Sequence, residues 1–227
     1  MRSVVREALL DAWAVLQPVE CAGCGAPDRG VCDRCRTALV PTVRRRLVDG
    51  LDRPVHAAAD YDGVLRAVLL AGKEEGRTDA LRSLAPMLAA AVAAAVSGVA
   101  GESRGEVELA WVPSSRAARR RRGYDPVLVM IRAARLPASR VLVASGRVEQ
   151  KRLRLAERVE TAPGRLRATT RLDGRAFVLI DDVVTSGATI RAAADAIRLG
   201  GGDVRAVCCL GTVTLRYPTR DTDGGGR

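Results

Sequence analysis

The most informative segment of the chain reads Phe177-Val178-Leu179-Ile180-Asp181-Asp182-Val183-Val184-Thr185-Ser186-Gly187-Ala188-Thr189. Residues 177–180 are continuously apolar, which is typical of a strand buried on both faces, and the apolar spacing becomes helical over residues 190–199. The polar turn therefore follows the carboxyl end of a strand. Open α/β sheets bind their ligands at that end.

The turn between this strand and the helix has the composition of an anion site. A helix that begins at about Thr189 would direct its free backbone N–H groups and its positive dipole end towards an anion. Gly187 allows the backbone to approach closely, and Thr185 and Ser186 supply hydroxyl donors together with Thr189. The turn therefore predicts a phosphate-binding loop.

Two adjacent carboxylates, Asp181 and Asp182, precede this turn. Because carboxylates and phosphate are both anionic, we expect a ribose between them. Its vicinal hydroxyls would bind the carboxylates directly or through a divalent cation, while the turn binds its 5′-phosphate. The segment resembles the PRPP-binding signature of the type I phosphoribosyltransferases over the whole motif. The alternative interpretation is a strand followed by an ordinary helix start that Asp182 caps.

A second pattern lies near the amino end, where two CxxC pairs are separated by seven residues. Its members are Cys21, Cys24, Cys32 and Cys35. Four thiolates at this spacing fit one tetrahedral zinc ion and leave no open coordination position, so the zinc would be structural. The alternative, two disulfides, needs an oxidising compartment that nothing else in the sequence supports.

The composition limits the classes of protein that fit. The chain has 227 residues, of which 48% are hydrophobic, enough for one substantial domain and a small appendage. Its net charge of +11 favours anionic ligands such as nucleotides, pyrophosphate or nucleic acid, although a high-GC genome would also raise the arginine content. Only 3% of the residues are aromatic, which argues against a base-stacking platform for single strands.

The sequence shows neither a secretion signal nor a clear membrane span. Residues 2–16 form an amphipathic pattern interrupted by charges and lack the apolar centre of a signal peptide. Residues 84–100 are alanine-rich, weakly hydrophobic and short for a bilayer span. We therefore expect a soluble cytoplasmic protein without membrane insertion.

Alternating strand and helix patterns predict an α/β fold with a parallel sheet flanked by helices. The predicted strands span residues 55–61, 107–112, 140–144, 177–180 and 204–214. The last of them contains Cys208 and Cys209, which we expect to be buried. The polar residues 73–78 predict a loop. Residues 79–99 predict one long helix whose first turns Pro86 would kink, and residues 149–160 predict a charged helix.

These elements divide into three parts. Residues 1–50 are expected to form an amino-terminal helix and a small zinc-binding module. Residues 51–217 are expected to form a phosphoribosyltransferase-like domain. Residues 218–227 are glycine-rich at their end and are expected to be disordered.

A second candidate segment, residues 113–125, also follows a predicted strand. Ser114 and Ser115 offer small donors, and Arg116 adds a positive charge suited to a pyrophosphate group. Residues 119–123, which include Arg122, are expected to form a mobile basic loop beside the site. The alternatives for this arginine run are a solvated charged loop and a nucleic-acid patch.

The chain as a whole resembles the ComF family of competence-associated proteins, with the features in the same order. They are the cysteine quartet, Tyr61-Asp62-Gly63 followed by Lys73, the Pro113-Ser114-Ser115 turn, Arg122-Gly123-Tyr124-Asp125, the helix 150–158 and the loop 181–189. The chain departs from the family at Asp125 and Pro126, where the family commonly has Asn and Gln. It also lacks an Asn that the family commonly has shortly after the position of Arg158.

This resemblance implies a type I phosphoribosyltransferase domain joined to a tetra-cysteine zinc module. PRPP would then bind with its 5′-phosphate on Thr185, Ser186, Gly187, Ala188 and Thr189, its ribose hydroxyls near Asp181 and Asp182, and its Mg²⁺-bound pyrophosphate near Ser114, Ser115 and Arg116. The residues expected to carry the transfer to a nitrogenous acceptor are Asp181, Asp182, Arg116 and Arg122. Residues 119–122 would close over the site and exclude water.

The same resemblance implies a second class of function. ComF-like proteins are associated with natural transformation, so the chain could bind single-stranded DNA or other competence proteins without catalysing a reaction. In that case the zinc module and the arginines would make the contacts, since a fold alone does not fix a function.

Overall fold

The computed structural model describes residues 20–27, 30–48, 50–100, 106–144 and 166–213. The predicted amphipathic stretch 2–16, the predicted helix 149–160 and the predicted tail 218–227 lie outside the described residues.

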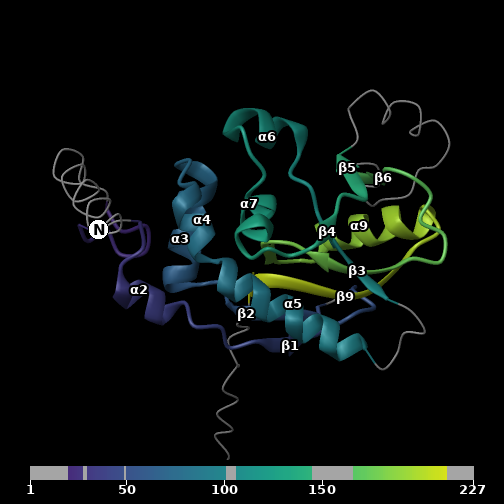
Figure 1. Ribbon diagram of the computed structural model, residues 1–227, viewed down its shortest axis with the longest axis horizontal. Helices are drawn as coiled ribbons and strands as arrows, with labels where there is room; N and C mark the ends of the chain where they lie inside the picture. Colours follow the sequence, from purple (N-terminus) through teal and green to yellow (C-terminus); the bar gives the residue numbers. More distant parts are fainter. Residues whose placement is uncertain (1–19, 28–29, 49, 101–105, 145–165, 214–227) are drawn as a thin grey trace, which may run out of the picture.

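The described residues form a central sheet in the strand order β1-β2-β9-β7-β3-β4, with the short β8 beside β9 (Figure 1). Its strands are β1 (Arg44–Arg46), β2 (Val55–Asp60), β3 (Val107–Trp111), β4 (Ala138–Ser139), β7 (Ala176–Ile180), β8 (Val183–Val184) and β9 (Asp203–Thr212). Neighbouring strands are parallel except β1, which runs antiparallel to β2. The prediction of a mostly parallel sheet is therefore confirmed.

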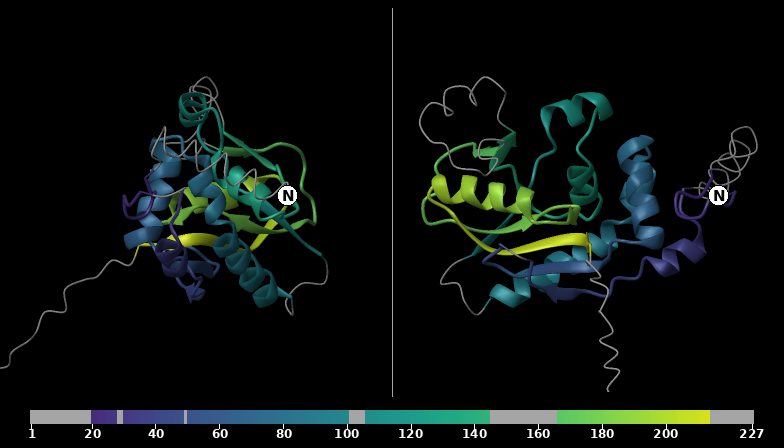
Figure 2. Two further views of the ribbon diagram at one scale, coloured as in Figure 1. Left: turned by 60° about the vertical axis from the view of Figure 1, so that its left-hand side comes forward. Right: turned by 180° about the vertical axis from the view of Figure 1, so that it is seen from behind.

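Helices cover both faces of this sheet, and Figures 1 and 2 show α5 and α9 on different sides of it. Their bounds are α2 (Asp33–Ala38), α3 (Gly63–Glu74), α4 (Thr78–Ser83), α5 (Ala85–Val99), α6 (Arg116–Arg122), α7 (Pro126–Ala133) and α9 (Ala188–Leu199). A small antiparallel pair, β5 (Leu142–Ala144) and β6 (Leu166–Ala168), lies beside α9. Among the described residues, we find no helix with the length and apolar character needed to cross a membrane.

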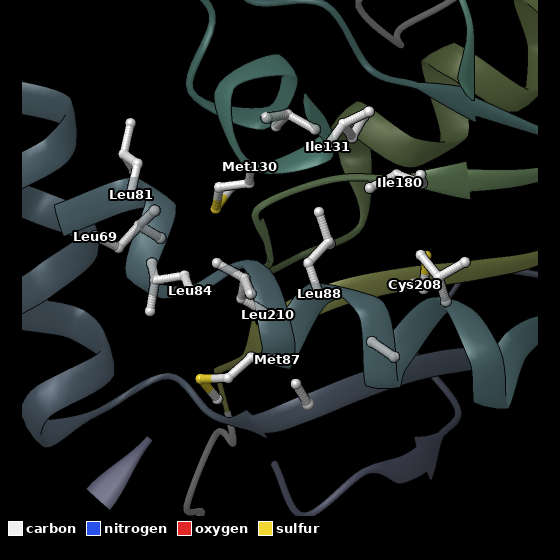
Figure 3. Packing of buried hydrophobic residues seen from close by; sticks show 14 of the residues in the cluster. Leu69, Leu81, Leu84, Met87, Leu88, Met130, Ile131, Ile180, Cys208 and Leu210 are labelled. Carbon is white, nitrogen blue, oxygen red and sulfur yellow. The ribbon is translucent and has the colours of Figure 1, made fainter. Parts of the chain in front are cut away.

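Alternate side chains of β7 enter two separate cores. Val178 and Ile180 belong to a cluster with α3, α4, α5 and α7, whose packing around Leu88 and Met130 is drawn in Figure 3. Phe177 and Leu179 belong to a second cluster under α9. A strand with helices on both faces needs apolar side chains at every position, which explains why residues 177–180 are continuously apolar.

The segment that contains Cys21, Cys24, Cys32 and Cys35, called the cysteine segment below, packs into the first of these cores. Cys21 and Cys35 are 3% and 2% exposed and belong to the same cluster as Leu65 of α3 and Leu81 of α4. Arg77, at the start of α4, donates from Nη1 to the carbonyl of Glu20 at 2.6 Å. The segment is thus packed against α3 and α4.

Three predicted elements differ in the structure. Lys73 was expected in a loop but lies in the last turn of α3. The helix predicted over residues 79–99 with a kink at Pro86 is two helices, since α4 ends at Ser83 and α5 begins at Ala85. Pro86, which has no N–H to donate, lies in the first turn of α5. The arginine run expected as a mobile loop is the helix α6, since arginine is a good helix former and Gly123, at φ +80°, ends it in the left-handed conformation.

Candidate functional site

The candidate site lies where the connections from two neighbouring strands diverge. Parallel β3 and β7 end level, since Trp111 pairs with Ile180 and the N–H of Val112 donates to the carbonyl of Ile180 at 3.0 Å. After β7 the chain passes through α9 to β9, on one side, and after β3 it passes through α6 and α7 to β4, on the other. The carboxyl ends of β3 and β7 therefore form a topological switch point, the usual ligand crevice of open α/β sheets.

Both predicted carboxylates lie at this edge. Asp181 is 9% exposed, its N–H donates to the carbonyl of Cys208 at 3.0 Å, and its Oδ1 accepts from the N–H of Asp182 at 2.8 Å. Burial and then the neighbouring Asp182 charge raise the pKa of Asp181 well above its usual range, against the opposing effects of the Asp182 N–H and Lys73. Burial and the adjacent carboxylate therefore both oppose ionisation of Asp181.

Lys73, which the sequence analysis placed in a loop, lies in the last turn of α3 and contacts this pair. Its Nζ lies 2.8 Å from Oδ2 of Asp182, and the two side chains are only 21% and 16% exposed. The sequence singled out Lys73 only as part of a resemblance, because the spacing of a lysine at a helix end and an aspartate after a strand does not itself predict a contact. Their meeting depends on how α3 packs against the sheet.

The predicted phosphate turn is open to solvent at its hydroxyls. Thr185, Ser186 and Thr189 are exposed, whereas Gly187 is buried and adopts φ +72° at the N-cap of α9. A Cβ at Gly187 would lie 3.2 Å from Cγ of Leu51, so a larger residue there is disfavoured both by conformation and by space. Gly187 has no side chain to accept from the first N–H groups of α9, which leaves them to a ligand or to solvent.

The second predicted segment follows β3 directly. The N–H of Ser114 donates to Oδ2 of Asp125 at 2.8 Å, and Oγ of Ser115 accepts from Ala118 to cap α6. Asp125 also accepts from the first N–H groups of α7 through Oδ1. Asp125 is thus a positioning residue that holds the serine turn, and the Asp-Pro pair at the start of an apolar helix was the sequence signal for it.

The arginines of α6 divide into two groups. Arg116, Arg119 and Arg120 are exposed, and α6 contains no buried residue. Arg121 and Arg122 lie 3.5 Å from the Glu74 carboxylate, and Nε of Arg122 donates to the carbonyl of Lys73 at 2.7 Å. The structure therefore links Arg122 to the carboxylate pair through Lys73, and leaves Arg116 exposed at the start of α6.

The four amino-terminal cysteines converge. Their sulfur atoms all lie within 4.8 Å of one another, and Sγ of Cys24 is 3.7 Å from Sγ of Cys32. Four sulfurs at about 2.3 Å from one tetrahedral zinc would lie about 3.8 Å apart, so this cluster could hold such a metal. Cys208 and Cys209 lie far along the chain in β9 and are fully buried, as predicted.

The thiols of this cluster differ in acidity. Burial opposes ionisation of Cys21, but the N–H groups of Cys32 and Gly23 donate to its sulfur and lower its pKa to about 6. Burial and the surrounding sulfurs raise the pKa of Cys35 to about 12. A bound cation would stabilise four thiolates together, which the crowded sulfurs alone disfavour.

An open hollow of about 560 Å³ lies elsewhere, at the carboxyl end of α9. Its lining includes Arg171 and Arg198, which pair with Asp173 and Asp195. The hollow is next to Gly200, before the start of β9, and thus at the opposite edge of the sheet from Asp181. It contains none of the predicted site residues.

Searches of protein-family models and of curated proteins find no match to this chain. Its function therefore has to be inferred from the residues of the site.

Proposed function

We propose that this chain is a ComF-like, PRPP-binding phosphoribosyltransferase of the cytoplasm. The observation that carries the proposal is the arrangement around Asp181 and Asp182. They directly follow β7 at the switch point and precede an exposed hydroxyl turn at the start of α9. Carboxylates for a ribose diol and a helix start for its phosphate are thus adjacent in the chain.

In the proposed reaction, the bond from the anomeric carbon to pyrophosphate breaks, and a bond to the nitrogen of an acceptor forms as that nitrogen loses a proton. The carboxylate pair orients the ribose, and the turn 185–189 holds the 5′-phosphate. The developing charge on pyrophosphate is met by the serine turn, Arg116 and Arg122. Bound Mg²⁺ would supply further neutralisation of that charge.

The four cysteines would hold a structural zinc ion in this proposal. Four thiolates leave no open position on the metal, so it takes no part in the transfer. The zinc ion would instead stabilise the cysteine segment and the helices α3 and α4 that pack against it.

The test is a calorimetric titration of the zinc-loaded protein with PRPP in Mg²⁺, beside the double variant Asp181→Ala/Asp182→Ala. We expect saturable binding by the unmodified protein and a loss of affinity of roughly 100-fold in the variant, about 2.7 kcal/mol, because the ribose hydroxyls lose both acceptors. Glu108→Gln is the control, since Glu108 pairs with Arg175 at the other end of β3 and β7. Failure of the folded, unmodified protein to bind PRPP would refute the proposal.

A second candidate function is a competence accessory that binds single-stranded DNA or a DNA-uptake partner. The observation that favours it is the set of exposed arginines on α6. Figure 1 shows the helix α6 projecting beyond α7, away from the sheet. Together with the net charge of +11, they offer a surface for a polyanion.

The DNA-binding candidate predicts a specific salt dependence. Arg119→Gln/Arg120→Gln is expected to reduce the slope of log affinity against log salt by about 1.4, because each lost phosphate contact on a single strand removes about 0.7. Fluorescence anisotropy with a labelled oligonucleotide at several salt concentrations measures this slope. The double aspartate variant should keep its DNA affinity. An unchanged slope in the arginine variant would show that Arg119 and Arg120 make no phosphate contacts, contrary to this candidate.

A further inference from the structure

Lys73 touches two parts of the candidate site through two different groups. Its side-chain Nζ lies 2.8 Å from Oδ2 of Asp182, and its backbone carbonyl accepts from Nε of Arg122 at 2.7 Å. One residue therefore joins the carboxylate pair after β7 to the arginine helix α6.

The side chains at this junction are more enclosed than their polarity would suggest. Lys73, Asp182 and Arg122 are 21%, 16% and 15% exposed, although α6 itself contains no buried residue. Contacts so shielded from water are stronger than surface pairs of the same geometry. Since α6 has no buried apolar residue to fix it, these polar contacts can determine its position.

The carboxyl end of α6 is tied to the last turn of α3 by polar contacts. Besides the bond from Arg122 to Lys73, Arg121 and Arg122 lie 3.5 Å from the Glu74 carboxylate. The hydroxyl of Tyr124, just after α6, donates to the carbonyl of Gly72. The position of α6 therefore depends on the conformation of this turn of α3, residues 72–74.

The residue type at position 73 is unusual for this chain. Lys73 and Lys151 are the only lysines among 37 basic residues. Arginine presents a wide planar fork, whereas the lysine ammonium is a compact charge on a flexible stem that can change partners. A lysine here suits a contact that forms and breaks.

We propose that Lys73 is a positioning residue that couples the state of Asp182 to the position of α6. When a ribose hydroxyl or a cation takes the Asp182 carboxylate, Lys73 loses its partner, and the last turn of α3 changes its hold on Arg122. The arginines of α6 then respond to occupation of the carboxylate pair. The use of this coupling in phosphoribosyl transfer rests on the proposed function, but the coupling itself is a property of the ligand-free protein.

The experiment is millisecond-resolved amide hydrogen exchange of the full chain without ligand. Lys73→Met keeps the backbone carbonyl and the length of the side chain but removes the charge, and Asp182→Asn removes the partner. We expect each variant to speed exchange of residues 116–122 several-fold, and the double variant to do no more than either single one, because both remove the same contact. Lys73→Arg keeps the charge and should exchange residues 116–122 as slowly as the unmodified protein. Glu108→Gln should leave the exchange rate of α6 unchanged.

A merely local ion pair would give a different result, with faster exchange at the end of α3 and an unaffected α6. That outcome would overturn the coupling, as would an effect of Lys73→Met that Asp182→Asn does not reproduce. Calorimetry with PRPP and Mg²⁺ on the same unmodified protein separates this inference from the proposed function. Coupling without PRPP binding would refute the proposed function alone. PRPP binding together with unchanged hydrogen exchange of α6 in the variants would refute the coupling alone.

Discussion

Chelation of the zinc proposed for the four cysteines is expected to lower the melting temperature of the whole protein by roughly 8–16 °C. Structural zinc sites contribute apparent binding free energies of about 10–16 kcal/mol. We take about 4 kcal/mol of this free energy to stabilise the whole protein. Because 1 kcal/mol moves the melting temperature of a domain of this size by about 2–4 °C, its loss gives the stated shift. Differential scanning calorimetry before and after chelation measures it.

The effect should be global because the cysteine segment is part of the main core. Cys21 and Cys35 are buried in the cluster that contains Leu65 and Leu81, and Arg77 bonds to the segment from the start of α4. Unfolding of the segment would expose the outer sides of α3 and α4 to water.

A matched variant identifies the metal as the cause. Cys35→Ser should lower the melting temperature by a similar amount, and chelation of that variant should add little. Restoring zinc should rescue the unmodified protein and not the variant. If metal analysis confirms complete removal of zinc and the melting temperature is unchanged, the four cysteines do not stabilise the fold through a metal.

The strand and helix around the carboxylates could be predicted because the signal is local. A continuous apolar run followed by a helical period specifies β7 and α9, and α9 begins at Ala188, one residue from the predicted start. The cysteine cluster was equally predictable, since the spacing of two CxxC pairs fixes which sulfurs can meet. In both cases, residues close together in the sequence are enough to determine the structure.

The remaining part of the site depends on contacts between distant segments. The position of Lys73 near a helix end does not identify its partner, and only the folded arrangement of α3 brings it to Asp182. The arginine run was expected to form a loop, but it forms the helix α6. Its partner Glu74 is the last residue of α3, 47 residues before Arg121, and no local pattern links the two.

Phe177→Ala is expected to destabilise the protein by about 3–5 kcal/mol, the largest effect of a single apolar substitution on β7. Phe177 is the only phenylalanine of the chain and is 0% exposed in the cluster under α9. Truncation removes the buried ring and leaves a cavity that neighbours fill only in part. Urea unfolding measures the change, and Leu199→Ala is the control because Leu199 is 90% exposed.

The position of Phe177 separates stability from ligand binding. Phe177 lies near the amino end of β7, whereas Asp181 follows the carboxyl end. The cavity left by the substitution is therefore at the opposite end of the strand from the carboxylate pair. The fraction of Phe177→Ala that remains folded should therefore bind PRPP with nearly unchanged affinity in calorimetry below its melting temperature, if the proposed function holds. A loss of affinity in fully folded Phe177→Ala would mean that strain travels along β7 to the site. Unfolding free energies equal to those of Leu199→Ala would mean instead that the ring contributes no packing, contrary to its burial.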